Sequence, residues 1–249
     1  MAAPDAIGQA IEWLAAARSV TVLTGAGVSK ESGVPTFRDA QSGLWGQYDP
    51  ETLASPEGFR RNPTLVWQWY AWRSEMVEQV APNPAHFALA RLGELKAVTL
   101  VTQNVDGLHE RAGSRNILEL HGNIRRYKCL SHGHPFLLED ARGREEPPAC
   151  PQCGSLIRPD VVWFGEMLSP SILKQAAEAA RTCDVMLVVG TSGLVQPAAS
   201  LPFYAAEAGA RTIEVNPEVT PLTRYLDLHL NGAAGAILPA LVAGVEEGR

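Results

Sequence analysis

Short apolar runs rich in β-branched residues recur along the chain at wide spacing, each bounded by turn residues. The runs are 19–25, 97–104, 184–192 and 211–216. Runs that are apolar throughout are typical of parallel strands buried on both faces. Alanine-rich stretches with helical spacing alternate with them, at 6–17, 85–96, 170–181 and 197–208. This alternation predicts an α/β fold, an open and doubly wound parallel sheet with helices on both faces.

Two segments depart from this pattern. Residues 40–84 are rich in Trp, Pro and Arg and are predicted to be helical or irregular, whereas residues 126–159 carry a cluster of cysteines. We interpret both as insertions that form a smaller lobe of a single domain spanning 1–249. The larger lobe then comprises about 1–39, 85–125 and 160–249. We expect the functional site in the cleft between the lobes, beyond the carboxyl ends of the strands.

Composition and charge narrow the classes of function. The 249 residues are 46% hydrophobic and 19% charged with a net charge of −6, which is ordinary for a globular domain. An acidic balance without a Lys/Arg cluster argues against nucleic acid as the main partner, and no apolar run approaches the length of a membrane span. The first residues lack a basic segment and a cleavage site, so we expect neither secretion nor organelle import and place the protein in the cytoplasm. A C-x-x-C pair among four cysteines then suggests metal or redox chemistry more than a disulfide framework.

A glycine loop follows the first predicted strand, in "VLTGAGVSKESGVPTFRD". Gly25 and Gly27 allow a tight turn and a close approach of the backbone to a phosphate. The dinucleotide fingerprint is incomplete because Lys30 stands at its third glycine position, and a simple turn is the alternative interpretation. Phe37 and Arg38 strengthen the case for a site, since they add an apolar cover and a cation that pairs with phosphate.

Polar residues also end the other predicted strands. Gln103, Asn104 and Asp106 in "TQNVDGLH" reach the same sheet edge as the glycine loop, although Asp106 alone can be a helix cap. The ends "GTS" at 190–192 and "EVNPE" at 214–218 carry small polar groups suited to ribose hydroxyls, and turn formation explains them nearly as well.

His121 follows a short apolar strand in "LELHGNIRR", at the junction with the cysteine-containing insert. A single histidine is more often structural than catalytic. Its position at the expected cleft nevertheless makes it a candidate base near neutral pH. The apolar run "VVWFGE" at 161–166 is predicted to offer a strand edge to an extended peptide.

The most aromatic segment, "VWQWYAWRSEM", contains Tyr70 and Arg73 three positions apart. In a helix this spacing places the phenol and the guanidinium on one face. Packing through the aromatic rings, with Arg73 stacked on an indole, is one explanation. A receptor for a carboxylate is the other.

Taken in order, these motifs resemble the sirtuins, the NAD-dependent protein lysine deacylases. The resemblance rests on GAG-x-S-x-x-S-G-x-P-x-F-R, TQN-x-D-x-L-H, LHG, W-F-G-E, GTS and V-N-P-E, and it covers about residues 19–240. It implies a Rossmann-type large domain, a small zinc domain, and NAD consumed as a co-substrate. Acylated-lysine proteins would be the substrates, and the products would be free lysine, nicotinamide and O-acyl-ADP-ribose.

The resemblance assigns roles to individual residues. His121 is similar to the general base of the family, acting with Asn104 and Asp106 as the expected catalytic group. The segment Val161, Val162, Trp163 and Phe164 resembles the one that pairs with the substrate backbone and lines the acyl-lysine tunnel. The expected NAD contacts are Gly25, Ala26, Gly27, Phe37, Arg38, Trp45, Gln103, Asn104, Val105, Asp106, Gly190, Thr191, Ser192, Asn216, Glu218 and Ala234.

The Tyr-x-x-Arg pair resembles the sirtuin subclass that removes malonyl, succinyl and glutaryl groups. Tyr70 and Arg73 would bind the acyl carboxylate, and the small Ala54 is consistent with a roomy pocket. We therefore expect succinyl or malonyl removal together with acetyl removal. The rivals are a lysine deacetylase in which Arg73 is incidental, a mono-ADP-ribosyltransferase, a non-catalytic reader of acyl-lysine and a hydride-transferring dehydrogenase.

The resemblance also implies one structural zinc ion, because sirtuins typically carry two C-x-x-C pairs in the small lobe. Only Cys150 and Cys153 form such a pair here, and the upstream element is Cys129-x-x-His132. We expect Cys129, His132, Cys150 and Cys153 as ligands, with His134 competing and a metal-free lobe as the alternative. Cys183 is predicted to be a buried thiol.

Overall fold

The computed structural model describes residues 4–34 and 48–248. The predicted contacts Phe37, Arg38 and Trp45 therefore lie outside the described residues. Six parallel strands form the main sheet in the order β3 (Ile117–Glu119), β2 (Ala97–Thr102), β1 (Ser19–Thr24), β7 (Val185–Val189), β8 (Arg211–Asn216) and β9 (Leu228–Asn231). The strand order reverses between β1 and β7, which is where ligands bind in doubly wound sheets.

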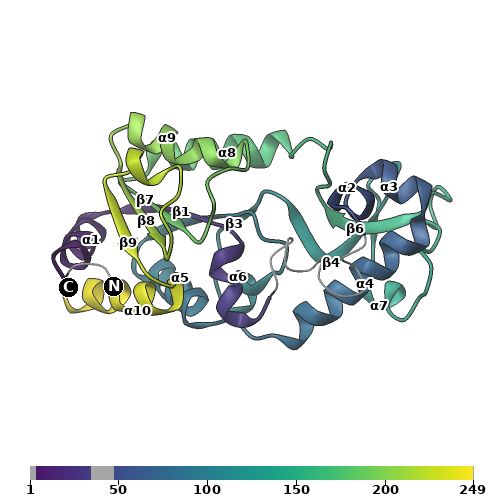
Figure 1. Cartoon of the computed structure of the whole chain (residues 1–249), viewed down its shortest axis with the longest axis horizontal. Helices are drawn as coiled ribbons and strands as arrows, with labels where there is room; N and C mark the ends of the chain where they lie inside the picture. The colour runs from purple at the N-terminus through teal and green to yellow at the C-terminus, as the bar shows by residue number, and fades with distance from the viewer. Residues whose placement is uncertain (1–3, 35–47, 249) are drawn as a thin grey trace.

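Helices cover both faces of this sheet (Figure 1). One face packs against α1 (Pro4–Ala16), α5 (Pro84–Leu95) and α10 (Ala234–Glu247), and the other against α8 (Pro170–Thr182) and α9 (Leu201–Glu207). The predicted α/β fold is thus confirmed. Its four strands and four helices lie near the expected positions, with a 3₁₀ turn, η5 (Ala198–Ser200), in place of the first turn expected for α9. Strand β9 and helix α10 are additional elements that the sequence analysis did not anticipate.

A second sheet lies at the end of the molecule opposite the two termini (Figure 1). It is antiparallel, in the order β5 (Pro135–Phe136), β4 (Gly122–Cys129) and β6 (Ile157–Val161). Four helices accompany it: α2 (Pro50–Leu53), α3 (Pro56–Arg61), α4 (Pro63–Gln79) and α7 (Leu138–Ala141). The second sheet extends beyond the segment 126–159 at both ends, because β4 begins at Gly122 and β6 ends at Val161.

Helix α4 carries the aromatic segment, and its start is encoded locally. The Asn62 side chain accepts a hydrogen bond from the Leu65 amide at 3.1 Å, and Pro63 occupies the first helical position, where no amide proton is needed. Tyr70 and Arg73 consequently lie one turn apart on the same side of this helix.

The segment 161–166 differs from its prediction, because only Val161 belongs to a strand. The Glu166 amide donates to the Trp163 carbonyl at 3.0 Å, and Gly165 has a φ of +82°. A left-handed residue of this kind interrupts an extended strand and favours glycine. The segment therefore forms a tight turn after β6.

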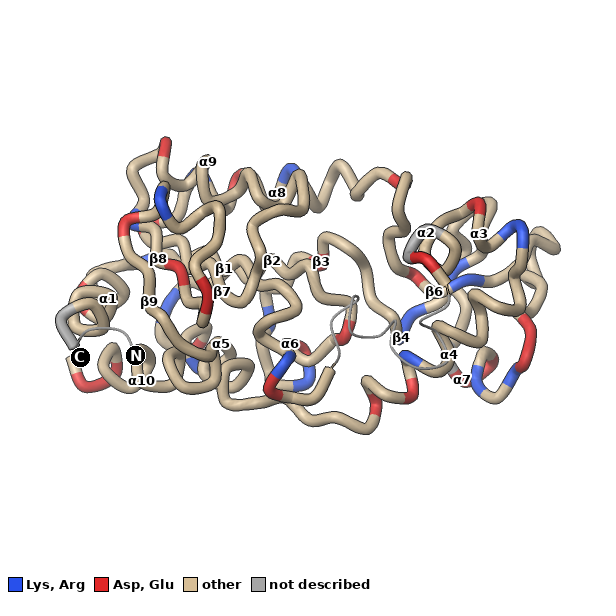
Figure 2. Tube along the Cα trace, viewed as in Figure 1, with Lys and Arg blue, Asp and Glu red and all other residues tan. Residues whose placement is uncertain are grey.

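Acidic and basic residues are scattered over both ends of the molecule (Figure 2). Within the part of the chain that the structure describes, none of the helices is long and apolar enough to cross a membrane.

Candidate active site

Three glycines, Gly25, Gly27 and Gly190, contact one another closely at the point where the strand order reverses. Gly27 donates its amide to the Gly190 carbonyl at 2.8 Å. A Cβ atom at Gly27 would lie 2.7 Å from that carbonyl oxygen, and one at Gly190 would lie 2.4 Å from the Val28 nitrogen. Gly190 also has a φ of +58°. Glycine is therefore required here for the contact between the two loops, a reason distinct from the phosphate approach inferred from sequence.

The side chains that follow β2 fill the space beside these glycines. Gln103 Nε2 donates to Thr191 Oγ1 at 3.0 Å, and Asn104 Nδ2 donates to the Gly25 carbonyl at 3.1 Å. The Asn216 amide, at the end of β8, donates to the Thr191 carbonyl at 2.9 Å. The structure thus brings together predicted residues from the carboxyl ends of β1, β2, β7 and β8.

Asp106 is buried and held by two donors. Ser29 Oγ donates to Asp106 Oδ2 at 2.7 Å, and the amide of Leu108, the first residue of the short helix α6 (Leu108–Arg111), donates to Oδ1 at 2.9 Å. Burial raises the pKa of Asp106, while these donors and the positive charge of Arg73 act in the opposite direction. Asn104 Nδ2 also donates to Ser29 Oγ at 3.1 Å, which links the two predicted catalytic partners through one hydroxyl.

His121 follows β3, and its ring is half-buried. Its Nδ1 lies 2.8 Å from the Gln103 carbonyl oxygen. A carbonyl only accepts, so Nδ1 carries the proton and Nε2 keeps a free lone pair. Burial lowers the pKa of His121, which favours the neutral ring, although the bond to the Gln103 carbonyl partly opposes this shift. A neutral imidazole with an accepting Nε2 is the form that a general base requires.

The remaining predicted NAD contacts lie at the rim of this region. Glu218 is exposed, and its amide donates to Asn216 Oδ1 at 3.2 Å. Ala234 begins α10, and the amide of the next residue, Gly235, donates to Glu31 Oε2 at 2.7 Å. Ser192 and Ala26 are exposed and Val105 is half-buried in the same loops, and the Val105 carbonyl accepts from the Ile124 amide of β4 at 2.8 Å.

The turn after β6 connects His121 to the aromatic helix. The Val162 amide donates to the His121 carbonyl at 2.9 Å, and the Phe164 amide donates to the Ala54 carbonyl at 2.9 Å. Trp163 is buried, and its indole Nε1 donates to the Tyr70 hydroxyl at 2.9 Å. The predicted substrate residues of three separate segments therefore meet around one indole ring.

Tyr70 and Arg73 occupy the border between this cluster and the glycine loop. Burial raises the pKa of Tyr70 to about 12 despite the nearby positive charge of Arg73, so the phenol stays protonated. The half-buried Arg73 lies 4.9 Å from the ring centroid of Trp69 and borders a hollow that it shares with Val34. Burial lowers the pKa of Arg73, and electrostatic interactions with Tyr70 and Asp106 oppose that change. The guanidinium does stack on an indole, as the packing explanation expects, and the carboxylate receptor stays a prediction.

Cysteine and histidine side chains gather beyond β4. Ligand atoms of Cys129, His132, His134 and Cys153 all lie within 4.8 Å of one another. Cys150 Sγ lies 3.5 Å from His134 Nδ1, so five donors surround a space that four zinc ligands fill. Burial acts to raise the pKa of Cys129, but hydrogen bonds from His132, His134, Cys153 and Cys150 outweigh it and lower the value to about 7. This donor set fits zinc, and it includes His134, which the sequence analysis ranked only as a competitor.

Two buried histidines adjoin the site and were not identified from the sequence. The rings of His86 and His109 are 4.8 Å apart. His86 Nε2 lies 3.4 Å from Ser29 Oγ, and His109 Nε2 lies 3.0 Å from Thr24 Oγ1. Burial lowers the pKa of His86 to about 4 and that of His109 to about 3. The sequence did hold a signal for part of this group, because Ser29 lies in the motif GAG-x-S and His109 in the motif TQN-x-D-x-L-H.

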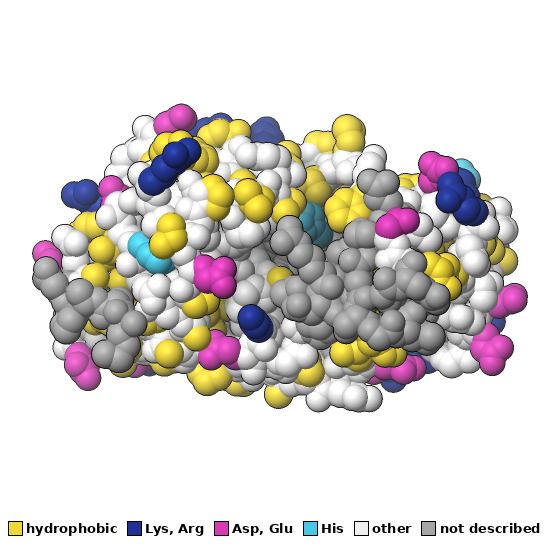
Figure 3. All heavy atoms as spheres, viewed as in Figure 1, with side chains coloured by type: hydrophobic (Ala, Val, Ile, Leu, Met, Phe, Trp, Pro, Cys, Tyr) yellow, Lys and Arg dark blue, Asp and Glu magenta, His cyan; other side chains and the backbone are white. Residues whose placement is uncertain are grey.

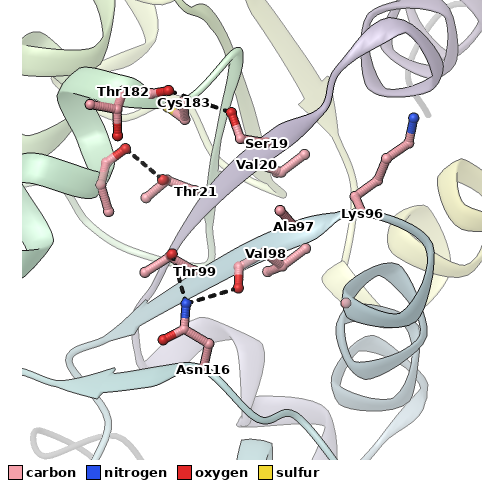
Figure 4. Close-up of a pocket in the computed structure, with 12 residues that line it drawn as sticks. Ser19, Val20, Thr21, Lys96, Ala97, Val98, Thr99, Asn116, Thr182 and Cys183 are labelled. Carbon is pink, nitrogen blue, oxygen red and sulfur yellow. Dashed lines mark hydrogen bonds between the residues drawn. The ribbon is translucent and has the colours of Figure 1, made fainter.

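A separate cavity of about 340 Å³ opens at the amino ends of β1 and β2, at the sheet edge opposite the candidate site (Figure 4). Thr21, Thr99 and Asn116 contribute polar atoms to it, and none of its lining residues belongs to the predicted site. The space-filling view shows hydrophobic side chains exposed at several places along the upper part of the molecule (Figure 3). Among the exposed residues are Phe164 and Met167 of the turn after β6 and Leu194 and Val195 after β7.

Comparisons with known proteins agree with this geometry. The Sir2 family model matches residues 25–197. NAD-dependent protein deacylase 2 of Pyrobaculum aerophilum is 52% identical over 234 residues, covering 94% of this chain and 93% of the relative. The NAD-dependent protein deacylase of Ralstonia nicotianae is 54% identical over 236 residues, covering 94% and 95%. The crystal structure of a Sir2 homologue in complex with NAD has a TM-score of 0.91 and 48% identity, covering 96% of this chain and 94% of that one.

The fold and the site define an α/β protein whose polar strand-end residues gather at the switch point of a doubly wound sheet. This chain belongs to the Sir2 family. The predicted family resemblance is thereby confirmed.

Proposed function

We propose that this protein is an NAD-dependent protein lysine deacylase that removes acetyl groups and favours acyl groups ending in a carboxylate, such as succinyl and malonyl. NAD-dependent deacylase is the name of the relatives that are about half identical over nearly the whole chain. The NAD complex of a solved homologue supports the assignment of NAD as co-substrate.

The observation that carries the catalytic part is the hydrogen bond from His121 Nδ1 to the Gln103 carbonyl. It leaves Nε2 as an acceptor that can take a proton from a ribose hydroxyl. In NAD, nicotinamide is a good leaving group on the anomeric carbon of the ribose. The acyl oxygen can attack this carbon as nicotinamide leaves. The protein has mainly to position these groups and exclude water, a task suited to the half-buried amides of Gln103 and Asn104. The ribose hydroxyl then attacks the acyl carbon, and one water enters as the C–N bond to lysine breaks, so the expected products are free lysine, nicotinamide and O-acyl-ADP-ribose.

The observation that carries the acyl preference is the direction of the Tyr70 hydroxyl. An indole N–H only donates, so the Tyr70 oxygen accepts from Trp163 and the phenolic proton remains available to a ligand. Arg73 lies one helical turn away on the same side. A carboxylate entering an apolar tunnel needs such donors, because an unpaired buried charge costs several kcal/mol.

One zinc ion would stabilise the smaller lobe. Cys129, His132 and Cys153 are common to the predicted ligand set and the observed cluster, and the fourth ligand would be Cys150 or His134. The ion would be structural, since a site with four protein ligands leaves no position open for substrate.

A product assay tests the proposal. Acetyl- and succinyl-lysine peptides are incubated with and without NAD, and the products are identified by mass. We expect NAD-dependent release of nicotinamide together with O-acyl-ADP-ribose. An ADP-ribosylated protein instead would identify a mono-ADP-ribosyltransferase, and reduced cofactor would identify a dehydrogenase.

The acyl preference is tested by Arg73→Met. We expect kcat/KM for the succinyl peptide to fall about a hundredfold, as for loss of a hydrogen-bonded charge pair, while the acetyl peptide changes only a fewfold. Arg61→Met is the matched control, because Arg61 pairs with Glu57 on the exposed surface of α3. Equal losses for both peptides in Arg73→Met would make Arg73 purely structural, and the enzyme would then be mainly a lysine deacetylase.

A further inference from the structure

A buried arginine stands directly behind the turn that presents Trp163. Arg158, in β6, is 2% exposed, and its guanidinium donates to Glu166 Oε1 at 2.5 Å and to Glu166 Oε2 at 3.0 Å. The same group donates to the Val161 carbonyl at 2.7 Å and to the Pro159 carbonyl at 3.3 Å. All three of its nitrogens are therefore engaged, which fixes the plane of the guanidinium.

That plane lies on the Trp163 ring. The Arg158 Cζ atom is 3.2 Å from the ring centroid. Glu166 adds a second restraint, because its Oε2 accepts the Trp163 backbone amide at 2.8 Å. Trp163 is thus held at its backbone by the carboxylate and at its ring by the guanidinium. Phe59 packs beside the ring, with the two ring centroids 5.3 Å apart.

The position of Trp163 determines how Tyr70 is used. With the indole N–H 2.9 Å from the Tyr70 oxygen, one lone pair of the phenol is occupied and its proton is directed away from Trp163. If the indole shifts or tilts, this hydrogen bond is lost and the hydroxyl is free to rotate. The donor that a ligand carboxylate requires is then no longer pre-organised.

We propose that the Arg158–Glu166 pair is a positioning device for acyl specificity, which acts through Trp163 to aim the Tyr70 hydroxyl at the carboxylate of an anionic acyl group. The inference rests on the proposed acyl preference and extends it to two residues behind the acyl site. Arg158 and Glu166 touch neither acyl group nor NAD in this account. Their effect on Tyr70 is measured by the preference between anionic and neutral acyl groups, because any effect through the peptide backbone is common to both.

A purely structural ion pair makes a different prediction. A buried pair that only supports the fold would lower stability when altered, and it would reduce activity toward all acyl groups equally. A positioning pair changes the ratio of kcat/KM for succinyl and acetyl peptides while the KM for NAD stays constant. This ratio is therefore the discriminating measurement.

Three variants loosen the arrangement at different points. Arg158→Lys keeps the positive charge but loses the flat face and the two-pronged contact with Glu166. Glu166→Gln keeps the shape of the side chain and removes its charge. Trp163→Phe keeps an aromatic ring over Arg158 and removes the N–H donor together with the pyrrole part of the indole, so it tests the link to Tyr70 even if an altered ion pair prevents folding. Arg142→Lys is the matched control. Arg142 pairs with Glu78, which lies on the exposed side of α4, the helix that also carries Tyr70.

The experiment measures kcat/KM for succinyl and acetyl peptides, KM for NAD and the melting temperature in each variant, with Arg73→Met in parallel. We expect the succinyl-to-acetyl ratio to fall about tenfold in each of the three variants, the cost of one misdirected hydrogen bond to a charge, with KM for NAD unchanged. Arg142→Lys should keep the ratio. An unchanged ratio in all three variants that fold, beside a reduced ratio in Arg73→Met, would overturn this inference alone. An unchanged ratio in Arg73→Met would overturn the proposed acyl preference and this inference with it.

Discussion

The glycine loops at the switch point and the aromatic cluster around Trp163 organise polar groups by different means. At the switch point, Gly25, Gly27 and Gly190 bring backbones into direct contact, and amide side chains then fill the remaining space. Around Trp163, side-chain contacts dominate the geometry, through one indole N–H, one phenol and one ion pair that also holds the Trp163 backbone amide. The first arrangement leaves little freedom for substitution. The second can be retuned by exchanging single side chains, which suits a pocket that selects among acyl groups.

The largest expected effect comes from His121, which lies between the two regions. His121→Ala should lower kcat for deacylation by about 10³-fold or more, since it removes the proposed base. NAD binding should persist, because the interlocked loops do not depend on the imidazole. Product formation by mass and NAD affinity by calorimetry provide the two readouts. Near-normal turnover would remove His121 from this role.

The dependence of the switch point on glycine is tested by a matched pair of substitutions. Gly190→Ala forces a Cβ atom against the Val28 nitrogen, 2.4 Å away, and we expect affinity for NAD to fall about a hundredfold, as for a few kcal/mol of lost contact. Gly209→Ala is the control, because Gly209 also has a positive φ, +89°, but a Cβ there meets nothing within 4 Å. Similar losses of NAD affinity in both variants would attribute the effect to backbone strain alone.

The zinc proposal concerns the far end of the aromatic region. Cys153→Ser should abolish bound zinc, measured per chain by elemental analysis, and should lower the melting temperature. Cys183→Ser should keep the metal, since Cys183 follows α8 and donates to the Ala180 carbonyl. Among single variants at Cys150, His132 and His134, the two that lose zinc identify the remaining ligands. Protein purified without chelators that holds no zinc would contradict the proposal.

The last effect is a dependence of stability on pH, which leaves activity at neutral pH unchanged. Burial lowers the pKa of His86 to about 4 and of His109 to about 3, against 6.5 for a free histidine. The unfolded chain therefore binds protons below pH 6.5 that the folded chain does not, and stability falls as the pH is lowered toward 4. The loss from one such histidine is on the order of 3 kcal/mol. In His109→Phe the free energy of unfolding should vary less steeply between pH 6.5 and 4. An identical slope in denaturant titrations would show that His109 does not contribute.

Most of the main sheet could be predicted because its strands are apolar on both faces and end in glycine or polar residues. Strand β9 escaped prediction because "LHLN" is short and carries a histidine and an asparagine. The sequence predicts a strand at 161–166 because its residues favour extended structure. The structure has a turn there, whose shape the contacts of Glu166 with Trp163 and Arg158 determine. Such contacts join residues whose pairing no local pattern reveals.

The site was predicted unevenly for the same reason. Gln103, Asn104 and His121 stand at strand ends, so the topology alone brings them to the glycine loop. His86 comes from α5 and contacts Ser29 across the core, which sequence spacing does not encode. His132 and His134 are two positions apart in the sequence. Which of them binds a metal depends on the geometry of the loop.

The most direct test is a crystal structure with a succinyl-lysine peptide and an unreactive NAD analogue. The account predicts that the succinyl carboxylate lies within hydrogen-bond distance of both the Tyr70 hydroxyl and the Arg73 guanidinium, with His121 Nε2 facing the ribose. A carboxylate directed to solvent, with Arg73 remaining stacked on Trp69 and apart from the ligand, would contradict it.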